Sequence, residues 1–391
     1  MRALFKITVL MLITSAVAYG QKLSDIEMDE KHTIYKENFT TNENTTLVLN
    51  LNNTKAQIFQ SPDDKVYIEY TKEFKNTKKK RIQSQLELFI VSGKKEGNKI
   101  TYSSKTRSAL GDRRYRFEEL MINRLEKKKF FKDSTQKPIE RKSLNSVFQE
   151  IKASDSLLRN KLFGTLKIKP HVKKWKKSDQ IIITKMIIKI PKNIHVRATL
   201  ENSNLAFMDD FYNRATMNVR NTKLKFKTVG NALSIFDIDN GYFNAGDVTS
   251  GSYSFANVRQ VKIGKLKNTS INSEFTKVEI GEIGKKVEIV DFTSKYLIHN
   301  FSKGFGNFKM NTEYSEINLF FPEDKDFYLE TFGYDTVHQF AKNVTTETTP
   351  NGKNEKHKML VIGKETALNK IKFITIHGIV RLGEDFIDLR E

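Results

Sequence analysis

The sequence contains no cysteine. Disulfides, thiolate nucleophiles, cysteine-ligated zinc and lipid attachment through a thiol are therefore excluded. Proline is scarce, with 6 in 391 residues, and this scarcity suits long runs of paired strands because proline cannot donate to a neighbouring strand. After residue 20 no apolar run approaches the roughly 20 residues that a membrane-spanning helix needs, so we expect no transmembrane span in the mature chain. Packing must supply the stability, and 28 phenylalanines and 13 tyrosines are available for it.

Recognisable catalytic patterns are also missing. The seven histidines are scattered and none has the close spacing of a metal site, and no serine lies in Gly-x-Ser-x-Gly. We therefore expect a protein that is not an enzyme and that uses no metal and no cofactor.

Residues 1–20 have the pattern of a signal peptide. Arg2 and Lys6 precede an apolar run over residues 7–17, and small residues at Ala18 and Gly20 favour cleavage before Gln21. The prediction is a protein secreted across the inner membrane, with a periplasmic, outer-surface or extracellular location.

Four serines separated by 21 residues each open a short β-like segment. They are Ser252, Ser273, Ser294 and Ser315. A fixed period of about 20 residues that is filled with strands is typical of a solenoid in which each repeat is one coil. The regular spacing favours a structural role for the hydroxyls at successive corners over nucleophilic catalysis.

Asparagines mark further corners of the predicted coils. Asn202, Asn221 and Asn240 are separated by 19 residues, and Asn240 is followed by Gly241. Asparagine and glycine both tolerate the left-handed backbone that a sharp bend needs. The predicted fold class is all-β, a single-stranded β-solenoid (β-helix-like) of roughly 20-residue coils, with a basic, partly α-helical insertion.

The predicted organisation has five parts. After the signal peptide come N-terminal β coils or a cap (21–103), the basic insertion (104–180), the solenoid repeats (181–322) and C-terminal strands with a cap (323–391). Apolar residues in the insertion recur at helical spacing. Residues 105–178 hold 22 Lys or Arg against 8 Asp or Glu, so 22 − 8 = +14 of the net charge of +21 lies in this segment.

Two lysine clusters in the insertion are the predicted binding residues. They are Lys127, Lys128 and Lys129, and Lys173, Lys174, Trp175, Lys176 and Lys177. Such clusters suit an anionic glycan, a lipid headgroup or another anionic component of the cell envelope. The alternative is a solvated basic face that Trp175 anchors. A protein partner stays unidentified, and sequence-specific nucleic-acid binding is not expected for a secreted protein.

The chain resembles the bacterial secreted putative-adhesin families, including the head domains of putative autotransporter adhesins. The resemblance rests on residues 188–196 (IKIPKNIHV), Asn240-Gly241, Ser250-Gly251 and residues 376–380 (IHGIV), and it covers about residues 45–103 and 181–380. It implies a β-solenoid, secretion, and a binding or structural role at the cell envelope or in the extracellular matrix, without a defined catalytic site.

Two alternative functions remain open. Asp237 and Asp239 share one face if their segment is extended, and with Asp209, Asp210 and Asp247 they suggest a polysaccharide-active β-helix enzyme. Solvated carboxylates at turns are the competing interpretation. The second alternative is envelope sensing through a protein partner.

Overall fold

The computed structural model describes residues 27–107, 181–320, 327–340, 347–349 and 357–383. All of the described residues belong to one compact unit. The predicted all-β class is confirmed, because the described residues form strands in one large sheet together with a single short helix, α2 (Lys79–Leu86). None of the described helical segments has the length and apolar character needed to cross a membrane.

The strands form because apolar and polar residues alternate along them. In β2 (Thr46–Asn52) Leu47, Leu49 and Leu51 are buried, while the residues between them face outward. The same alternation recurs in β11 (Thr269–Glu274), β13 (Val287–Phe292) and β21 (Lys370–Ile376). Each strand therefore has one face in a common core and one face in solvent.

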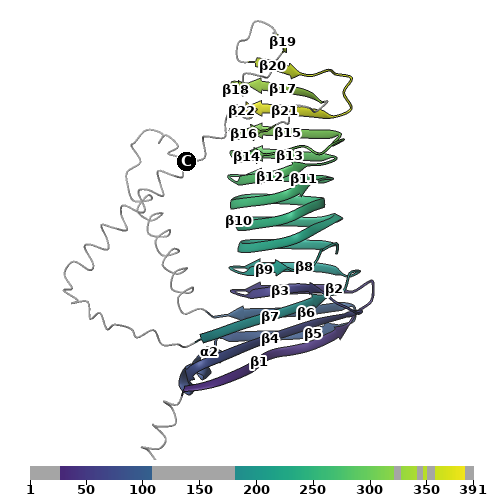
Figure 1. Ribbon diagram of the computed structural model, residues 1–391. Helices are drawn as coiled ribbons and strands as arrows, with labels where there is room; N and C mark the ends of the chain where they lie inside the picture. The colour runs from purple at the N-terminus through teal and green to yellow at the C-terminus, as the bar shows by residue number, and fades with distance from the viewer. Residues whose placement is uncertain (1–26, 108–180, 321–326, 341–346, 350–356, 384–391) are drawn as a thin grey trace, which may run out of the picture. The chain divides into compact units, whose positions relative to one another are not determined.

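The middle of the unit is a stack of parallel levels, each made of two strands that meet at a bend (Figure 1). One side of the stack contains β8 (His195–Glu201), part of β10, β11, β13 and β15 (Asn307–Glu313). The other side contains β9 (Asn204–Phe207), part of β10, β12 (Lys277–Ile283), β14 (Lys295–Ile298) and β16 (Glu316–Leu319).

The long strand β10 (Ala215–Leu266) runs through several levels and includes the bends at Asn221, Asn240 and Asn257. Paired positions lie 19 residues apart at Val196 and Ala215, 18 apart at Thr269 and Val287, and 21 apart at Lys295 and Glu316. The level length thus varies around the predicted value of about 20.

The two ends of the stack do not follow chain order. β21 lies between β15 and β17 (Tyr328–Tyr334), and β22 (Ile379–Leu382) lies between β16 and β18 (Val337–Phe340). At the other end β2 lies between β6 (Lys99–Thr106) and β8, and β3 (Lys55–Gln60) lies between β7 (Ile181–Ile190) and β9. The chain leaves the described part at the end of β6 and returns to it at the start of β7.

Antiparallel strands cover both ends of the stack. At one end β4 (Lys65–Lys78) pairs with β1 (Glu27–Thr40) and β7, and β5 (Phe89–Glu96) pairs with β6. At the other end β20 (His357–Ile362) pairs with β17 and with the short β19 (Glu347–Thr349). These strands occupy the edges that the parallel levels would otherwise leave unpaired.

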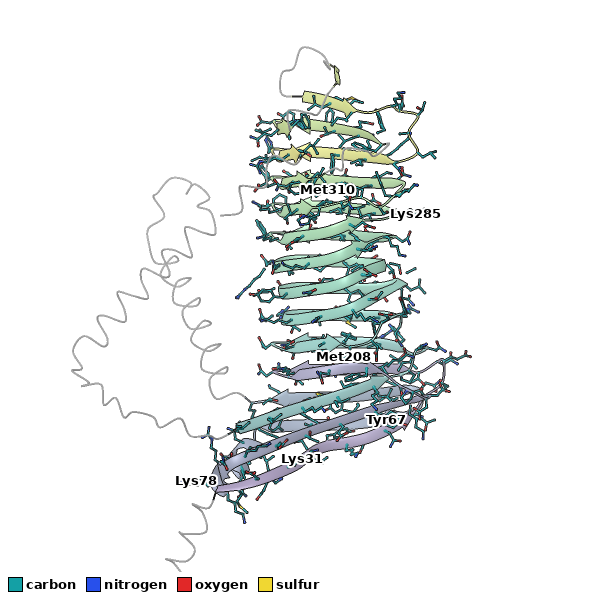
Figure 2. All side chains as sticks on the ribbon, in the orientation of Figure 1. Lys31, Tyr67, Lys78, Met208, Lys285 and Met310 are labelled. Atoms are coloured by element: carbon teal, nitrogen blue, oxygen red, sulfur yellow. The ribbon has the colours of Figure 1, made fainter. Side chains whose placement is uncertain are left out.

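The core is a continuous column of side chains inside the levels. Ring pairs join successive levels, as where Phe236 and Tyr253 stack with centroids 4.7 Å apart. Figure 2 shows side chains along every level, with the fully buried Met310 within the stack and the exposed Lys285 at its margin. Buried side chains fill the core, so a ligand would contact the outer faces, the bends or the ends of the stack.

Candidate functional site

One bend of each level contains a residue with a left-handed backbone. Asn202, Asn221 and Asn240 have φ angles of 49°, 52° and 58°, and Gly241 follows with a φ of 115°. Asparagine accepts this conformation more readily than most residues. The amide of Asn240 also donates to the side-chain oxygen of Asn221 at 2.7 Å, so neighbouring bends are linked.

A row of buried hydroxyls lies directly behind this bend. In most levels the residue after the left-handed one is serine or threonine, and its hydroxyl accepts a backbone N–H of the preceding level. The hydroxyl of Ser203 accepts from the backbone N–H of Thr54 at 3.1 Å, and the hydroxyl of Thr222 accepts from the N–H of Ser203 at 3.0 Å. In the same way the hydroxyl of Ser294 accepts from the N–H of Thr276 at 3.0 Å. The row therefore satisfies backbone donors that a sharp bend would leave unpaired.

The four serines of the 21-residue period are not equivalent. Ser294 and Ser315 belong to the hydroxyl row, each after a left-handed residue. Ser252 and Ser273 differ from the prediction, because Ser252 is exposed inside β10 and Ser273 is buried inside β11. Partners in the levels around them lie 18 residues apart, so an interval of 21 does not return to the same position.

Three of these serines surround one buried carboxylate, that of Asp291. Ser273 and Ser315 donate their hydroxyls to it, the latter at 2.5 Å, and the backbone N–H of Ser294 donates at 3.2 Å. The hydroxyl of Tyr296 contacts Ser273 in turn. Burial, and next the charge of Asp291, hold the pKa of Tyr296 well above its ordinary value. This closed network joins three levels and has no access for a substrate, so its role is structural.

Asp237 and Asp239 both lie on an outer face, as their spacing predicts. Asp237 is exposed, whereas Asp239 lies 3.7 Å from the guanidinium of Arg220 and accepts from Asn257 at 3.5 Å. Among the residues that the structure describes, no three His, Asp or Glu side chains are placed to hold a metal ion.

Asp209 and Asp210 line a separate hollow of about 330 Å³ together with Lys192 and Tyr212. The carboxylate of Asp209 accepts the N–H of Gln60 at 2.9 Å, which ties this loop to β3. Asp247 lies within β10 and is not among the residues that line this hollow.

A larger hollow of about 680 Å³ lies on the face formed by β6, β2, β8 and β10. Its lining contains two cationic side chains, Lys99 and Arg197, and one carboxylate, that of Glu96, which pairs with Lys94 at 2.8 Å. The remainder includes the neutral Asn98, Thr199 and Asn218. Arg197 is exposed and forms no ion pair with a described residue. The lining of the hollow thus has two cations against one carboxylate, together with neutral hydrogen-bonding groups.

His195 lies next to this hollow, beside Thr216 of its lining. Burial, and then the nearby Arg214 and Arg197, lower the pKa of His195 below its ordinary value. The ring nitrogen Nε2 lies 3.3 Å from the hydroxyl of Thr216. Arg214 and Arg197 therefore place positive charge near this side of the hollow.

The predicted binding lysines lie outside the described residues. These are Lys127, Lys128, Lys129, Lys173, Lys174, Lys176 and Lys177, together with Trp175. The hollow around Arg197 was not predicted, because it depends on how four separate segments of the chain pair with one another. The alternation of apolar and polar residues predicts only which side chains of each strand point outward.

Comparison with known proteins finds no matching family model and no matching curated protein. The chain matches two solved structures of adhesion proteins over about 90% of its length. One is a putative cell adhesion protein from Clostridium sporogenes ATCC 15579, at 7% identity, 91% coverage of this chain, 99% of the other and a TM-score of 0.18. The second is a putative adhesin from Bacteroides fragilis NCTC 9343, at 7% identity, 90% and 96% coverage and a TM-score of 0.28. Both are described as putative adhesion proteins, and the sequence resemblance also names putative adhesins. TM-scores of this size do not establish a common arrangement of whole chains, so no property of either protein is transferred.

Proposed function

We propose that this chain is a secreted β-solenoid with an adhesin-like, non-catalytic role in binding or structure at the cell envelope or in the extracellular matrix. The parallel register of successive levels, the repeated left-handed bend and the closed core support the solenoid interpretation. Stacked levels present long, regular outer faces, which suit extended partners better than enclosed small molecules.

The hollow around Arg197 is the observation that best supports a binding role. Its two cations, amides and hydroxyls fit a sulfate, carboxylate or phosphate group of an extended polymer, and Lys94 offsets the charge of the one lining carboxylate, Glu96. The basic clusters at residues 127–129 and 173–177 add positive charge from the sequence. The proposed partner is therefore an anionic glycan or another anionic component of the envelope.

Immobilised heparin provides a defined anionic probe. The full chain should bind it with an affinity that falls as salt rises, because screening weakens contacts between exposed charges. Arg197→Gln and, separately, glutamine at Lys173, Lys174, Lys176 and Lys177 should each weaken binding, whereas Lys265→Gln on the opposite side of the stack should not. A parent protein that does not bind heparin at low salt would contradict the anionic partner.

The non-catalytic proposal and the location have their own tests. Incubation with a panel of acidic polysaccharides, with and without calcium, should release no product, and release that Asp237→Asn abolishes would overturn the proposal. Expression with residues 1–20 in a bacterial host should place a shortened chain beginning at Gln21 outside the cytoplasm. An unprocessed cytoplasmic chain would argue against secretion.

A further inference from the structure

Five aromatic rings follow one bend of the stack through successive levels. This row, called the aromatic edge, consists of Phe275, Phe292, Tyr314, His377 and Tyr334. In that order, neighbouring ring centroids lie 5.7, 6.0, 5.1 and 5.4 Å apart. Five levels spaced by about 4.8 Å give an edge roughly 20 Å long.

The aromatic edge is open to solvent. Phe275, Phe292 and Tyr314 are 40%, 39% and 52% exposed. Beside the rings, Val290 and Ile376 are also exposed on the outer faces of β13 and β21. Exposed apolar side chains that gather in one row, rather than singly, mark a surface used for binding.

The backbone beneath three of these rings is unfavourable for them. Phe275, Tyr314 and His377 have φ angles of 49°, 56° and 52°, at the bend where the earlier levels have asparagine. Those asparagines are Asn53, Asn202, Asn221, Asn240 and Asn257. A left-handed backbone is strained at a residue other than glycine or asparagine. The backbone of the bend would therefore favour asparagine at these three positions.

We propose that the aromatic edge binds an extended, uncharged, β-linked polysaccharide. The C–H groups on the face of a pyranose ring are weakly positive and pack on the negative face of an aromatic ring. One sugar unit of an extended β-linked chain is similar in length to the spacing between two levels, so successive sugars can meet successive rings. This inference rests on the proposed binding function and assigns it a second ligand class.

The charged residues next to the rings in the chain are mostly acidic, which favours an uncharged ligand over an anionic one. Asp335 follows Tyr334 and lies 3.1 Å from the ring nitrogen of His377, and the exposed Lys277 lies two residues after Phe275. Glu274 and Glu313 directly precede Phe275 and Tyr314, and neither carboxylate forms an ion pair with another described residue. A free carboxylate accepts hydrogen bonds from sugar hydroxyls and repels anions. The aromatic edge should therefore reject the sulfated or carboxylated polymers that suit the hollow around Arg197.

The dimensions of the aromatic edge favour a narrow ligand over a second protein. Stable protein interfaces engage about 20–30 residues on each side. The exposed apolar surface here is a single row of rings with a few aliphatic neighbours. A linear polysaccharide can contact such a row along its whole length.

The test compares the full chain with the double variant Phe275→Asn and Tyr314→Asn. Asparagine suits the left-handed backbone, so the variant should retain the parent's thermal midpoint or exceed it, and loss of binding cannot then be attributed to unfolding. Leu233→Asn, at a 65% exposed leucine outside the aromatic edge, is the matched control. The probes are cellohexaose and chitohexaose in calorimetry, with heparin as the anionic reference.

We expect the parent and Leu233→Asn to bind at least one hexasaccharide, and the double variant to bind it at least tenfold more weakly. Heparin binding should be equal in all three proteins, which separates this proposal from the anionic one. Equal hexasaccharide affinity in parent and double variant, or no binding by the parent, would overturn the proposal. Sedimentation that shows a parent dimer dissociating in the double variant would also overturn it, since a second copy would then cover the edge.

Discussion

The hydroxyl row can be tested at Thr276, which is 3% exposed. Its hydroxyl accepts the N–H of Val258 at 3.2 Å and donates to the carbonyl of Glu274 at 2.9 Å. Thr276→Val keeps the shape of the side chain and replaces the hydroxyl with a methyl group. The N–H of Val258 then has no acceptor in a buried position.

The expected loss follows from that unpaired group. An unsatisfied buried donor costs about 1–3 kcal/mol, and the extra methyl group recovers part of this by burial. We therefore expect the free energy of unfolding to fall by about 2 kcal/mol. Thr199→Val makes the same chemical change at an exposed strand position and should stay within about 0.5 kcal/mol of the parent.

Two readouts are needed, because stacked repeats need not unfold in one step. Urea denaturation followed by circular dichroism gives the midpoint, and hydrogen exchange gives the protection of the Val258 amide. Thr276→Val should lower the midpoint and accelerate exchange at Val258 and its neighbours. Equal midpoints and equal exchange in the two variants would refute the contribution of the hydroxyl row.

Three further predictions follow from local environments. Because the pKa of His195 is lowered in the folded protein, the unfolded chain takes up a proton at a higher pH than the folded chain does. The free energy of unfolding should therefore decline as pH falls below 6.5. Thermal melts at several pH values should show a shallower decline for His195→Gln. The raised pKa of Tyr296 has the opposite effect, because the unfolded chain loses its proton at a lower pH than the folded chain does, so stability should be lost as pH rises above 10.0. Tyr296→Phe should weaken this alkaline loss and should lower the free energy of unfolding by about 1 kcal/mol at neutral pH. Gly264→Ala should lower the free energy of unfolding in urea by about 1–3 kcal/mol, because the new Cβ would overlap the carbonyl oxygen of Gly246 in the adjacent level. An unchanged urea midpoint would mean that the two levels are less closely stacked at this position.

Local features of the fold were predictable because the sequence encodes them residue by residue. Alternation in β2 and β21 specifies which side chains are buried, and asparagine at residues 202, 221 and 240 specifies the left-handed bend. The serine period was misleading for a physical reason. Level lengths differ, so Ser273 pairs with Asp291 after 18 residues, and Ser294 aligns with Ser315 after 21.

The order of levels at the two ends was not predictable. Strands with the same alternation are interchangeable as neighbours, and nothing local indicates that β21 lies between β15 and β17. The hollow around Arg197 and the aromatic edge both depend on such pairings. Phe275 and Tyr314 were not singled out from the sequence, and their alignment with His377 depends on the positions of β21 and β22.

The most direct test of the account is the neighbour of β15, because this pairing completes both the stack and the aromatic edge. The chain has no cysteine, so Asn311→Cys with Ile374→Cys introduces a single pair on outward positions of adjacent strands. A separation of about 5 Å between paired Cα atoms lies within disulfide range. In the comparison variant, Asn311→Cys with Phe332→Cys, β21 lies between the two positions. Oxidation should cross-link the first pair and leave the second as free thiols. Cross-linking of the second pair without the first would place β17 beside β15 and contradict the account.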